Sequence, residues 1–320
     1  MLTIAKMTVR PLSPFDFELS ATIFSDGDRQ IRKYEKRRFW QVVRVDSKLF
    51  LAIITTAGTV DEPLLSVELE SNGKISKSDR VKAEEIVCAL FNLNFDLEPF
   101  YEEARKDSVM APLTHKLRGL KSPTTPNVFE ALIDSIVEQQ ISLNIANKME
   151  ERLIKAFGEV LGLDKQFYYA FPTPQKLASA SVRELRNCGL SQRKIEYIKD
   201  ISKMITDGEL KLEELKDYKD ANDIVKELDK IRGIGIWTAE LTMVRGMQRL
   251  EAFPADDLGL KRVISHYYCN DRKISGEEAR KIAEKWGTWK GLAGFYLIMA
   301  SAMDIDSFRN NTVAHGFKKR

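Results

Sequence analysis

The sequence predicts an α+β protein, with a small antiparallel β-sheet and its helices first and a larger helical part second. Two observations predict this class. Segments rich in β-branched and aromatic residues are confined to about residues 1–107, and amphipathic helical spacing dominates residues 108–320. At 320 residues the chain is long enough for two domains, each with its own core. We expect a mixed α+β domain over 1–107 and a helical domain over 108–320.

The predicted strands lie in two runs, RRFWQVVRVDSKLFLAIITTAGT (37–59) and PLLSVELES (63–71). Turn-forming DSK and SNGK interrupt them, which favours antiparallel pairing. The segment SDRVKAEEIVCALFNL that follows has apolar residues at helical spacing, with Ser78 or Asp79 as the expected N-cap. These segments together give the small mixed domain.

The helical domain opens with PNVFEALIDSIVEQQISLNIANKMEERLIKAFG, which predicts a helix from about Pro126 to Gly158, either interrupted or continuous at Gln140. FPTP (171–174) marks a helix entry, and Gly189 ends a helix. Strand signals nearly vanish after Ser108, so we expect the remainder to be a chain of amphipathic helices.

Composition narrows the functional classes only slightly. There are 50 basic and 47 acidic residues, a net charge of +3, which permits nucleic-acid binding without arguing for it. The cysteines, Cys88, Cys188 and Cys269, are too far apart for a disulfide framework, a zinc site or an iron–sulfur site. We expect a reducing, intracellular setting, with no signal peptide and no membrane-spanning helix.

The segment LDKIRGIGIWTAELTMVRG (228–246) predicts two helices joined by a tight glycine turn at Gly233 and Gly235. Free N–H groups at the start of the second helix can bind a phosphate, and main-chain contacts carry no base information. The motif therefore suits sequence-independent DNA binding. An ordinary helical hairpin with a glycine cap is the alternative reading.

Two adjacent carboxylates, Asp256 and Asp257, open the helix LGLKRVISHYY, and Asp257 follows Gly235 by 22 residues. A carboxylate at a helix N-terminus stays ionised, which suits a general base or a group that stabilises positive charge. Both aspartates could equally be N-caps. In this helix we expect a buried stripe of Leu258, Val263, Ile264 and Tyr267.

The combination of glycine hairpin and aspartate resembles the helix–hairpin–helix DNA glycosylase superfamily. FEALIDSIVEQQISLNIANKM (129–149) resembles its first core helix and DNA-facing loop, and GLAGFYLIMA (291–300) its closing helix. The resemblance covers roughly residues 108–303. The segment LSPFDFELSATIF makes the first domain similar to the N-terminal domains of 3-methyladenine DNA glycosylase II and 8-oxoguanine glycosylase.

The resemblance implies a helix–hairpin–helix glycosylase core of two helical subdomains, with the hairpin at 228–246. It places the catalytic carboxylate on Asp257, with Asp256 as a cap or supporting group. Bifunctional members have a nucleophilic lysine where this chain has Trp237, so the resemblance implies a monofunctional glycosylase that uses water. The implied substrates are alkylated purines of the 3-methyladenine and 7-methylguanine type, flipped out of double-stranded DNA during base excision repair.

The resemblance also implies DNA contacts. The hairpin would bind phosphates through N–H groups near Gly233, Gly235, Trp237 and Thr238, and Gln140 falls at or beside the position that fills the gap left by the flipped base. No cofactor is required, but family members hold K⁺ or Na⁺ at hairpin carbonyls. The matching carbonyls are those of Asp229, Ile231 and Ile234.

An aromatic pocket would attract a cationic base by cation–π interaction. The candidates are Trp237, Trp286, Phe129 and Tyr296, although buried aromatic residues of helical domains usually belong to the core. The basic stretch RQIRKYEKRR (29–38) is either a DNA contact or a solvated face.

Two other functions stay open: a glycosylase for uracil or thymine in mismatches, and a non-catalytic DNA-binding protein that uses the hairpin alone. A carboxylate facing phosphates would not serve a pure binder. We expect a monomer without a membrane partner, located in the cytoplasm with the nucleoid, or in the nucleus of a eukaryote. The tail HGFKKR is expected to fray.

Overall fold

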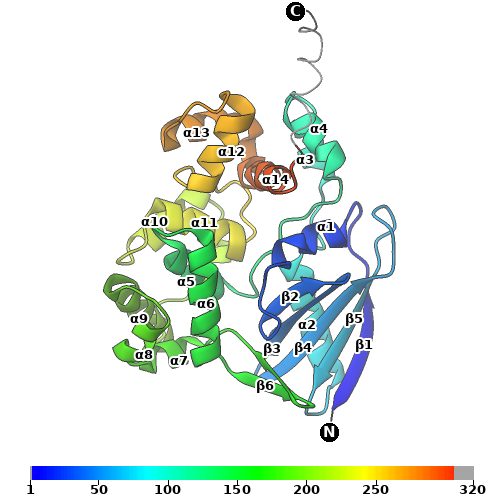
Figure 1. The fold of residues 1–320 in the computed structure, drawn as a ribbon, viewed down its shortest axis with the longest axis vertical. Helices are drawn as coiled ribbons and strands as arrows, with labels where there is room; N and C mark the ends of the chain where they lie inside the picture. The colour runs from blue at the N-terminus through cyan, green and yellow to red at the C-terminus, as the bar shows by residue number, and fades with distance from the viewer. Residues whose placement is uncertain (1, 306–320) are drawn as a thin grey trace, which may run out of the picture.

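The computed structural model describes residues 2–305, and the predicted α+β class is confirmed (Figure 1). The chain begins with a five-stranded antiparallel sheet in the order β1-β5-β4-β3-β2. Its strands are β1 (Thr3–Val9), β2 (Arg32–Glu35), β3 (Arg38–Val45), β4 (Lys48–Thr56) and β5 (Leu65–Ser71). The helices of this part are α1 (Phe17–Ala21) and α2 (Lys77–Leu90). The tail HGFKKR lies outside the described residues.

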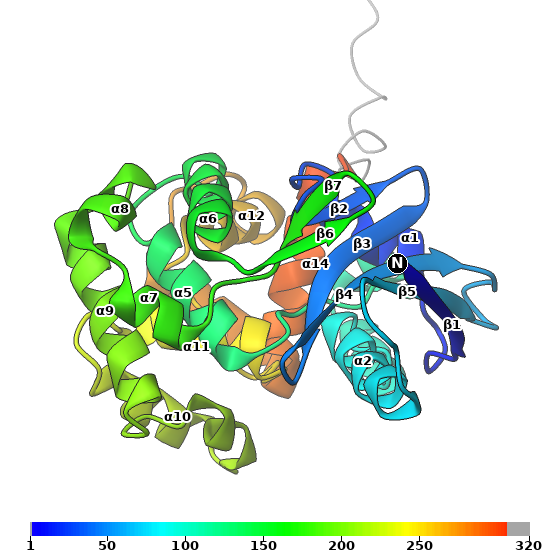
Figure 2. The ribbon, with the colours of Figure 1, turned by 90° about the horizontal axis from the view of Figure 1, so that it is seen from below.

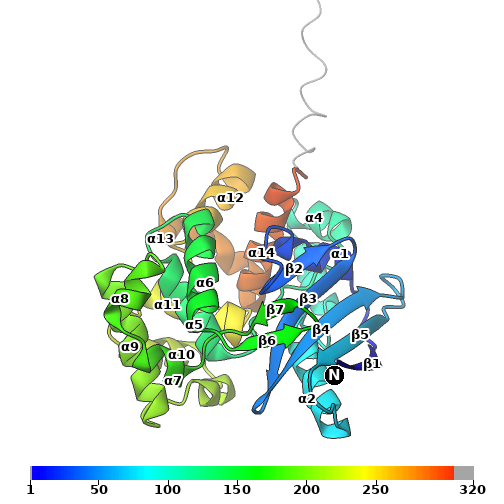
Figure 3. The same ribbon diagram turned by 60° about the horizontal axis from the view of Figure 1, so that its bottom comes forward.

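Both faces of the sheet are covered. On one face, Phe39, Phe50 and Val67 pack with the α2 residues Ala83 and Val87 in a buried cluster. The other face is covered by a hairpin of β6 (Val160–Leu163) and β7 (Gln166–Tyr169), which comes from the helical part of the chain (Figures 2 and 3).

The hairpin was missed in the sequence, where strand signals nearly vanish after Ser108. Its strands have only four residues each, with Gly162 inside β6, so they carry too few β-branched residues to register as strands. Leu161 and Leu163 nevertheless pack on Val42 and Leu51 of the sheet. The hairpin forms because that apolar face needs a cover.

The remaining helices follow in chain order and form two further hydrophobic clusters. They are α3 (Glu98–Ala104), α4 (Met110–Lys116), α5 (Val128–Glu138), α6 (Leu143–Phe157), α7 (Pro174–Ser179), α8 (Val182–Asn187), α9 (Gln192–Thr206), α10 (Ala221–Asp229), α11 (Ile236–Gly246), α12 (Leu258–Tyr268), α13 (Gly276–Ala283) and α14 (Lys290–Ala302). One cluster is built mainly from α5–α11, and the other from α3, α4 and α12–α14. These clusters are the two helical subdomains that the sequence predicts.

The cores meet at a different boundary from the predicted one. Leu93 belongs to the sheet cluster, whereas Leu97 and Phe100 pack with Tyr296 of α14. By packing, the first domain therefore ends before α3 rather than at residue 107. The apolar stripe of a short helix shows that it is buried, but does not show against which core.

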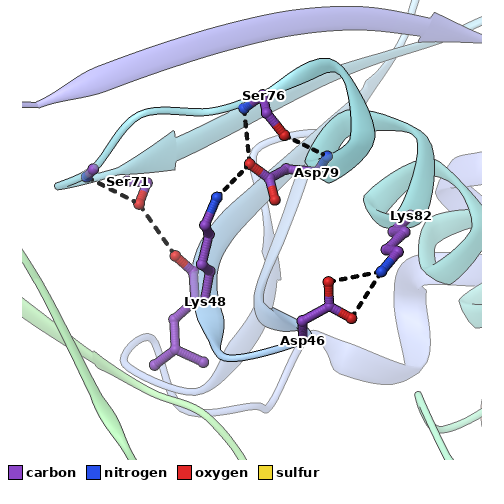
Figure 4. Close-up of polar contacts among 8 residues, drawn as sticks. Asp46, Lys48, Ser71, Ser76, Asp79 and Lys82 are labelled. Atoms are coloured by element: carbon purple, nitrogen blue, oxygen red, sulfur yellow. Dashed lines mark hydrogen bonds and ion pairs between the residues drawn. The ribbon is translucent and has the colours of Figure 1, made fainter.

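The start of α2 also differs from the prediction. The N-cap is Ser76, and Asp79 is the third residue of a capping box in which Ser76 N–H donates to Asp79 Oδ2 at 2.8 Å. Lys48 Nζ, beside the β3–β4 turn, donates to the same carboxylate at 2.8 Å (Figure 4). Asp79 thus ties the sheet to α2. The hydrogen bonds from Lys48 and Ser76 lower its pKa to about 2.

The first prediction concerns acid stability. Because the pKa of Asp79 is lower in the folded protein, its contribution is complete above the unfolded pKa of about 3.9 and is lost as the pH falls towards 2. Asp79→Asn should lower the Tm near pH 7, and the difference from wild type should shrink below pH ~4. Asp46→Asn, which removes the exposed ion pair to Lys82, is the control and should change the Tm little. A Tm difference independent of pH would contradict this assignment.

Candidate active site and DNA-binding hairpin

The two glycines between α10 and α11 have different roles. Gly233 has a φ of +90°, and a Cβ there would lie 2.4 Å from the ring of Tyr197. Gly235 is exposed, caps α11 in an extended conformation, and a Cβ there would meet nothing within 4 Å. Gly233 therefore makes the turn possible, whereas Gly235 leaves a bare backbone surface at the start of α11.

The glycine turn between α10 and α11 is bound by Gln139, a residue that the sequence analysis missed. Its Nε2 donates to the carbonyl of Gly233 at 2.9 Å and to Thr238 Oγ1 at 3.0 Å. Only the repeated glutamine in EQQIS hinted at such a role. Thr238 is buried, so its side chain is part of this internal contact.

The predicted helix from Pro126 to Gly158 is interrupted at Gln140. Gln139 (φ −51°, ψ 126°) and Gln140 (φ +59°) are the central residues of a turn between α5 and α6, and Ile141 N–H donates to the carbonyl of Glu138. These angles are those of a type II turn, in which the second position favours glycine. Gln140 is exposed at the tip, beside the residue that holds the hairpin.

Asp257 is the N-cap of α12, as one of the two readings predicts. Its Oδ1 accepts the N–H of Leu260 at 2.9 Å, and the residue is partly exposed. This cap uses one carboxylate oxygen and fixes the direction of the side chain. Asp256 is exposed, and its Oδ1 lies against Gly276 at the start of α13, so that a Cβ there would be 2.1 Å away.

The expected stripe of α12 is wrong at one end. Leu258 is 78% exposed, while Leu260, Val263 and Ile264 are buried. Leu258 is the first residue of the helix and points away from the face that packs against α14. An exposed leucine thus lies directly beside Asp257.

Two ion pairs join α11 to its neighbours α13 and α5. Arg280 of α13 binds Glu240 through both nitrogens, at 2.7 and 2.9 Å. Arg245 Nη1 donates to Glu138 Oε1 of α5 at 2.5 Å. Burial acts to lower the pKa of Arg245, but nearby carboxylates, with Glu138 the largest and Asp257 among them, raise it. Arg245 is therefore a partly exposed cation within the electrostatic reach of Asp257.

Comparison with known proteins identifies this arrangement. Residues 133–288 match a protein-family model described as "HhH-GPD superfamily base excision DNA repair protein". A DNA-3-methyladenine glycosylase of Bacillus subtilis (strain 168) is 36% identical over 221 residues, which are 68% of this chain and 72% of the relative. The chain belongs to the HhH-GPD superfamily. It is a DNA glycosylase of base excision repair.

Other known glycosylases are similar to this chain in sequence or in fold. DNA-3-methyladenine glycosylase 2 of Escherichia coli (strain K12) is 30% identical over 55% of this chain and 58% of its own length. A 3-methyladenine DNA-glycosylase structure from Archaeoglobus fulgidus aligns with a TM-score of 0.81 and 26% identity, over 93% of this chain and 98% of that one. The DNA-bound 8-oxoguanine glycosylase/lyase of Clostridium acetobutylicum aligns at 0.75 with 21% identity, over 95% of this chain and 98% of that one, a likeness of fold alone.

Three of the four aromatic pocket candidates of this HhH-GPD glycosylase lie in its cores. Tyr296 is fully buried and donates to the carbonyl of Leu120, and Trp286 is 2% exposed with Nε1 donating to Asp107. Phe129 is buried in the other helical cluster. Packing within the two cores accounts for all three rings, so we assign them to the core. Trp237, which is partly exposed, stays the pocket candidate.

The basic stretch 29–38 of the first domain is divided between exposed and inward-facing residues. Arg29 and Arg37 are exposed and pair with Glu35 and Glu18, so for them both readings of the stretch stay open. Arg32, from the basic stretch 29–38, turns inward to Glu130 and Glu150 instead of lying on a solvated face.

Within residues 2–305 there is no cluster of three or more histidine, cysteine or acidic side chains that could hold a metal ion. Over the same residues, no helix is long and apolar enough to cross a membrane.

Proposed function

We propose that this glycosylase hydrolyses the N-glycosidic bond of alkylated purines such as 3-methyladenine and 7-methylguanine, with Asp257 as its catalytic carboxylate. The observation that carries the proposal is the Asp257 carboxylate, partly exposed and oriented by its cap bond at the start of α12. Three relatives, from B. subtilis, E. coli and A. fulgidus, are named for 3-methyladenine and support the substrate class.

The DNA would approach the hairpin. N–H groups at the start of α11, near Gly235, Trp237 and Thr238, have no carbonyl one turn earlier in that helix and can bind phosphate oxygens. The bare backbone at Gly235 leaves room for the phosphodiester. The partner we propose is double-stranded DNA with a damaged base, bound by a monomer.

Gln140 is proposed to fill the gap left by the flipped base. Two observations support it: the residue is exposed at the tip of the α5–α6 turn, and it has a positive φ that an unbranched side chain adopts only at a cost. Gln139 fixes this turn to the hairpin, so the gap-filling side chain and the phosphate-binding backbone would act as one unit.

The reaction breaks the bond between the sugar C1′ and the purine nitrogen. The bonding electrons leave with the alkylated base, which becomes neutral, and positive charge develops on the sugar. The Asp257 carboxylate stabilises that charge and takes a proton from the attacking water, whose oxygen bonds to C1′. A base that is already cationic needs no general acid.

Trp237 is proposed as a wall of the base pocket. Its ring is partly exposed, while its Nε1–H is buried and has no acceptor within residues 2–305. Buried indole N–H groups are normally bonded, so an acceptor on the DNA would satisfy this donor. The ring could also stack on a cationic base.

We also propose a K⁺ or Na⁺ ion held by the main-chain carbonyls of Asp229, Ile231 and Ile234. The donor set fits, because hard cations prefer oxygen ligands and the Ile231 carbonyl, which accepts the N–H of Ile234, keeps a second lone pair. A bound ion would add positive charge beside a phosphate. No other cofactor is required.

The test is release of free bases from duplex DNA treated with dimethyl sulfate, resolved by chromatography. We expect 3-methyladenine or 7-methylguanine from the wild type. Release of uracil or thymine from G·U or G·T duplexes, with no methylated base, would replace this substrate class. Absence of any released base would leave a DNA-binding role without catalysis.

The lack of a lyase step gives a second prediction. The resemblance puts Trp237 at the position of the lysine of bifunctional members, and an indole cannot form a Schiff base. Borohydride added during turnover should trap no protein–DNA adduct on a denaturing gel, while abasic sites accumulate in the product. The control is a bifunctional 8-oxoguanine glycosylase/lyase, which should give the adduct. A trapped adduct with this protein would show that another amine acts as nucleophile.

A further inference from the structure

One face of α5 carries a row of acids at Glu130, Asp134 and Glu138, each four residues from the next. Helical acids at this spacing usually face solvent, but Glu130 is 3% exposed and Asp134 is 6% exposed. We call these three residues the acidic row. Charges this deeply buried need partners.

Two arginines from other elements bind the ends of the acidic row. Arg32 of β2 lies 3.6 Å from Glu130 and 2.7 Å from Glu150 of α6, and Arg245 of α11 bonds Glu138 at 2.5 Å. Arg44 of β3 also acts electrostatically on Glu130, so four carboxyl groups face three guanidinium groups, one of which bonds Glu159. The group is short of positive charge.

Asp134, the middle residue of the acidic row, pairs with neither arginine. Its Oδ1 is buried and accepts no hydrogen bond from any residue in the described part of the chain. Burial and the surrounding carboxylates raise the pKa of Asp134 well above its usual value. Since an unpartnered buried carboxyl is costly, its retention points to a ligand that supplies the missing partner.

The acidic row leads to the candidate active site. It ends one residue before Gln139, which bonds the hairpin, and its last member binds Arg245. Arg245 lies within electrostatic reach of both Asp134 and Asp257. A base flipped towards Asp257 would therefore enter the field of the row.

We propose that Asp134 is a specificity-determining residue whose free Oδ1 accepts a hydrogen bond from the exocyclic amino group of a flipped, positively charged purine. A cationic base would relieve the repulsion within this excess of carboxyl groups, so the group favours a cationic base over a neutral one. Both 3-methyladenine and 7-methylguanine carry such an amino group and a positive charge in DNA, whereas hypoxanthine has neither. This inference rests on the proposed function.

The experiment compares 7-methylguanine release with hypoxanthine release by the wild type, Asp134→Asn and Asp134→Leu. Asp134→Leu removes the acceptor oxygen and should lose methylated-base release by roughly tenfold to a hundredfold relative to hypoxanthine release, the usual effect of one hydrogen bond to a charged group. Asp134→Asn keeps an acceptor oxygen but removes the negative charge, so its loss should be smaller. Asp134→Leu should fold even if Asp134→Asn does not, because a well-packed apolar residue replaces an unpaired buried acid at little cost. Glu240→Gln, which removes a buried but paired carboxylate, should lower the Tm and leave the ratio unchanged.

Two failures can be told apart. If the wild type releases methylated bases and both Asp134 variants keep the wild-type ratio, Asp134 does not select the base and the proposed function stands. If the wild type releases no methylated base, the proposed function fails and this inference fails with it. An equal fall for both substrates would assign Asp134 a structural role instead.

Discussion

Asp257→Asn is expected to abolish base release and to leave DNA binding intact. The amide keeps the oxygen that caps α12, so the bond to Leu260 N–H and the start of the helix survive. It cannot stabilise positive charge on the sugar or take a proton from water. We expect single-turnover release to fall by roughly 10²- to 10⁴-fold.

The measurement is single-turnover release of 7-methylguanine beside a binding titration on the same duplex. Asp256→Asn is the matched control, since Asp256 is exposed and lies against Gly276. It should keep release within a fewfold of wild type. Unchanged release by Asp257→Asn, or lost DNA binding by that variant, would refute the catalytic role.

Gly233→Ala is expected to have the largest effect on the hairpin. A φ of +90° is strained for alanine, and the new methyl group would lie 2.4 Å from the Tyr197 ring. Adopting a left-handed conformation costs about 1–2 kcal/mol and overpacking adds about 1–3 kcal/mol. The turn should deform, which should weaken DNA binding and lower the Tm.

Gly235→Ala separates the two contributions to that result. A Cβ at Gly235 meets nothing within 4 Å, and its φ of −100° suits alanine, so the Tm should stay near the wild-type value. The methyl group would nevertheless stand on the surface where a phosphate must approach. If Gly235→Ala binds DNA as well as wild type, the phosphate does not approach this surface.

Much of the fold could be predicted because its signals are local. The β-branched runs gave the central strands, and the Gly-x-Gly turn gave the boundaries of α10 and α11 closely. Asp257 could be placed at the start of a helix from its short distance to the hairpin. These features depend on a few neighbouring residues, which the sequence displays directly.

What could not be predicted depends on contacts between distant segments. The burial of Phe129 and Tyr296 in cores is not visible in the chemistry of an aromatic ring. The acidic row shows in the sequence as an ordinary solvated spacing, and its partner Arg32 lies about a hundred residues earlier in the chain. Helical spacing fixes which side chains share a face, but not which segment covers that face.

The β6–β7 hairpin covers the sheet of the first domain but is synthesised later than that domain. A ribosome delivers Val42, Leu51 and Ile53 long before Leu161 and Leu163, which cover them in the finished protein. Through that interval one side of the sheet is a bare apolar surface, the kind of surface that invites aggregation or a chaperone. The second cover of this sheet is therefore made only after the whole first domain has been synthesised, about half-way along the chain.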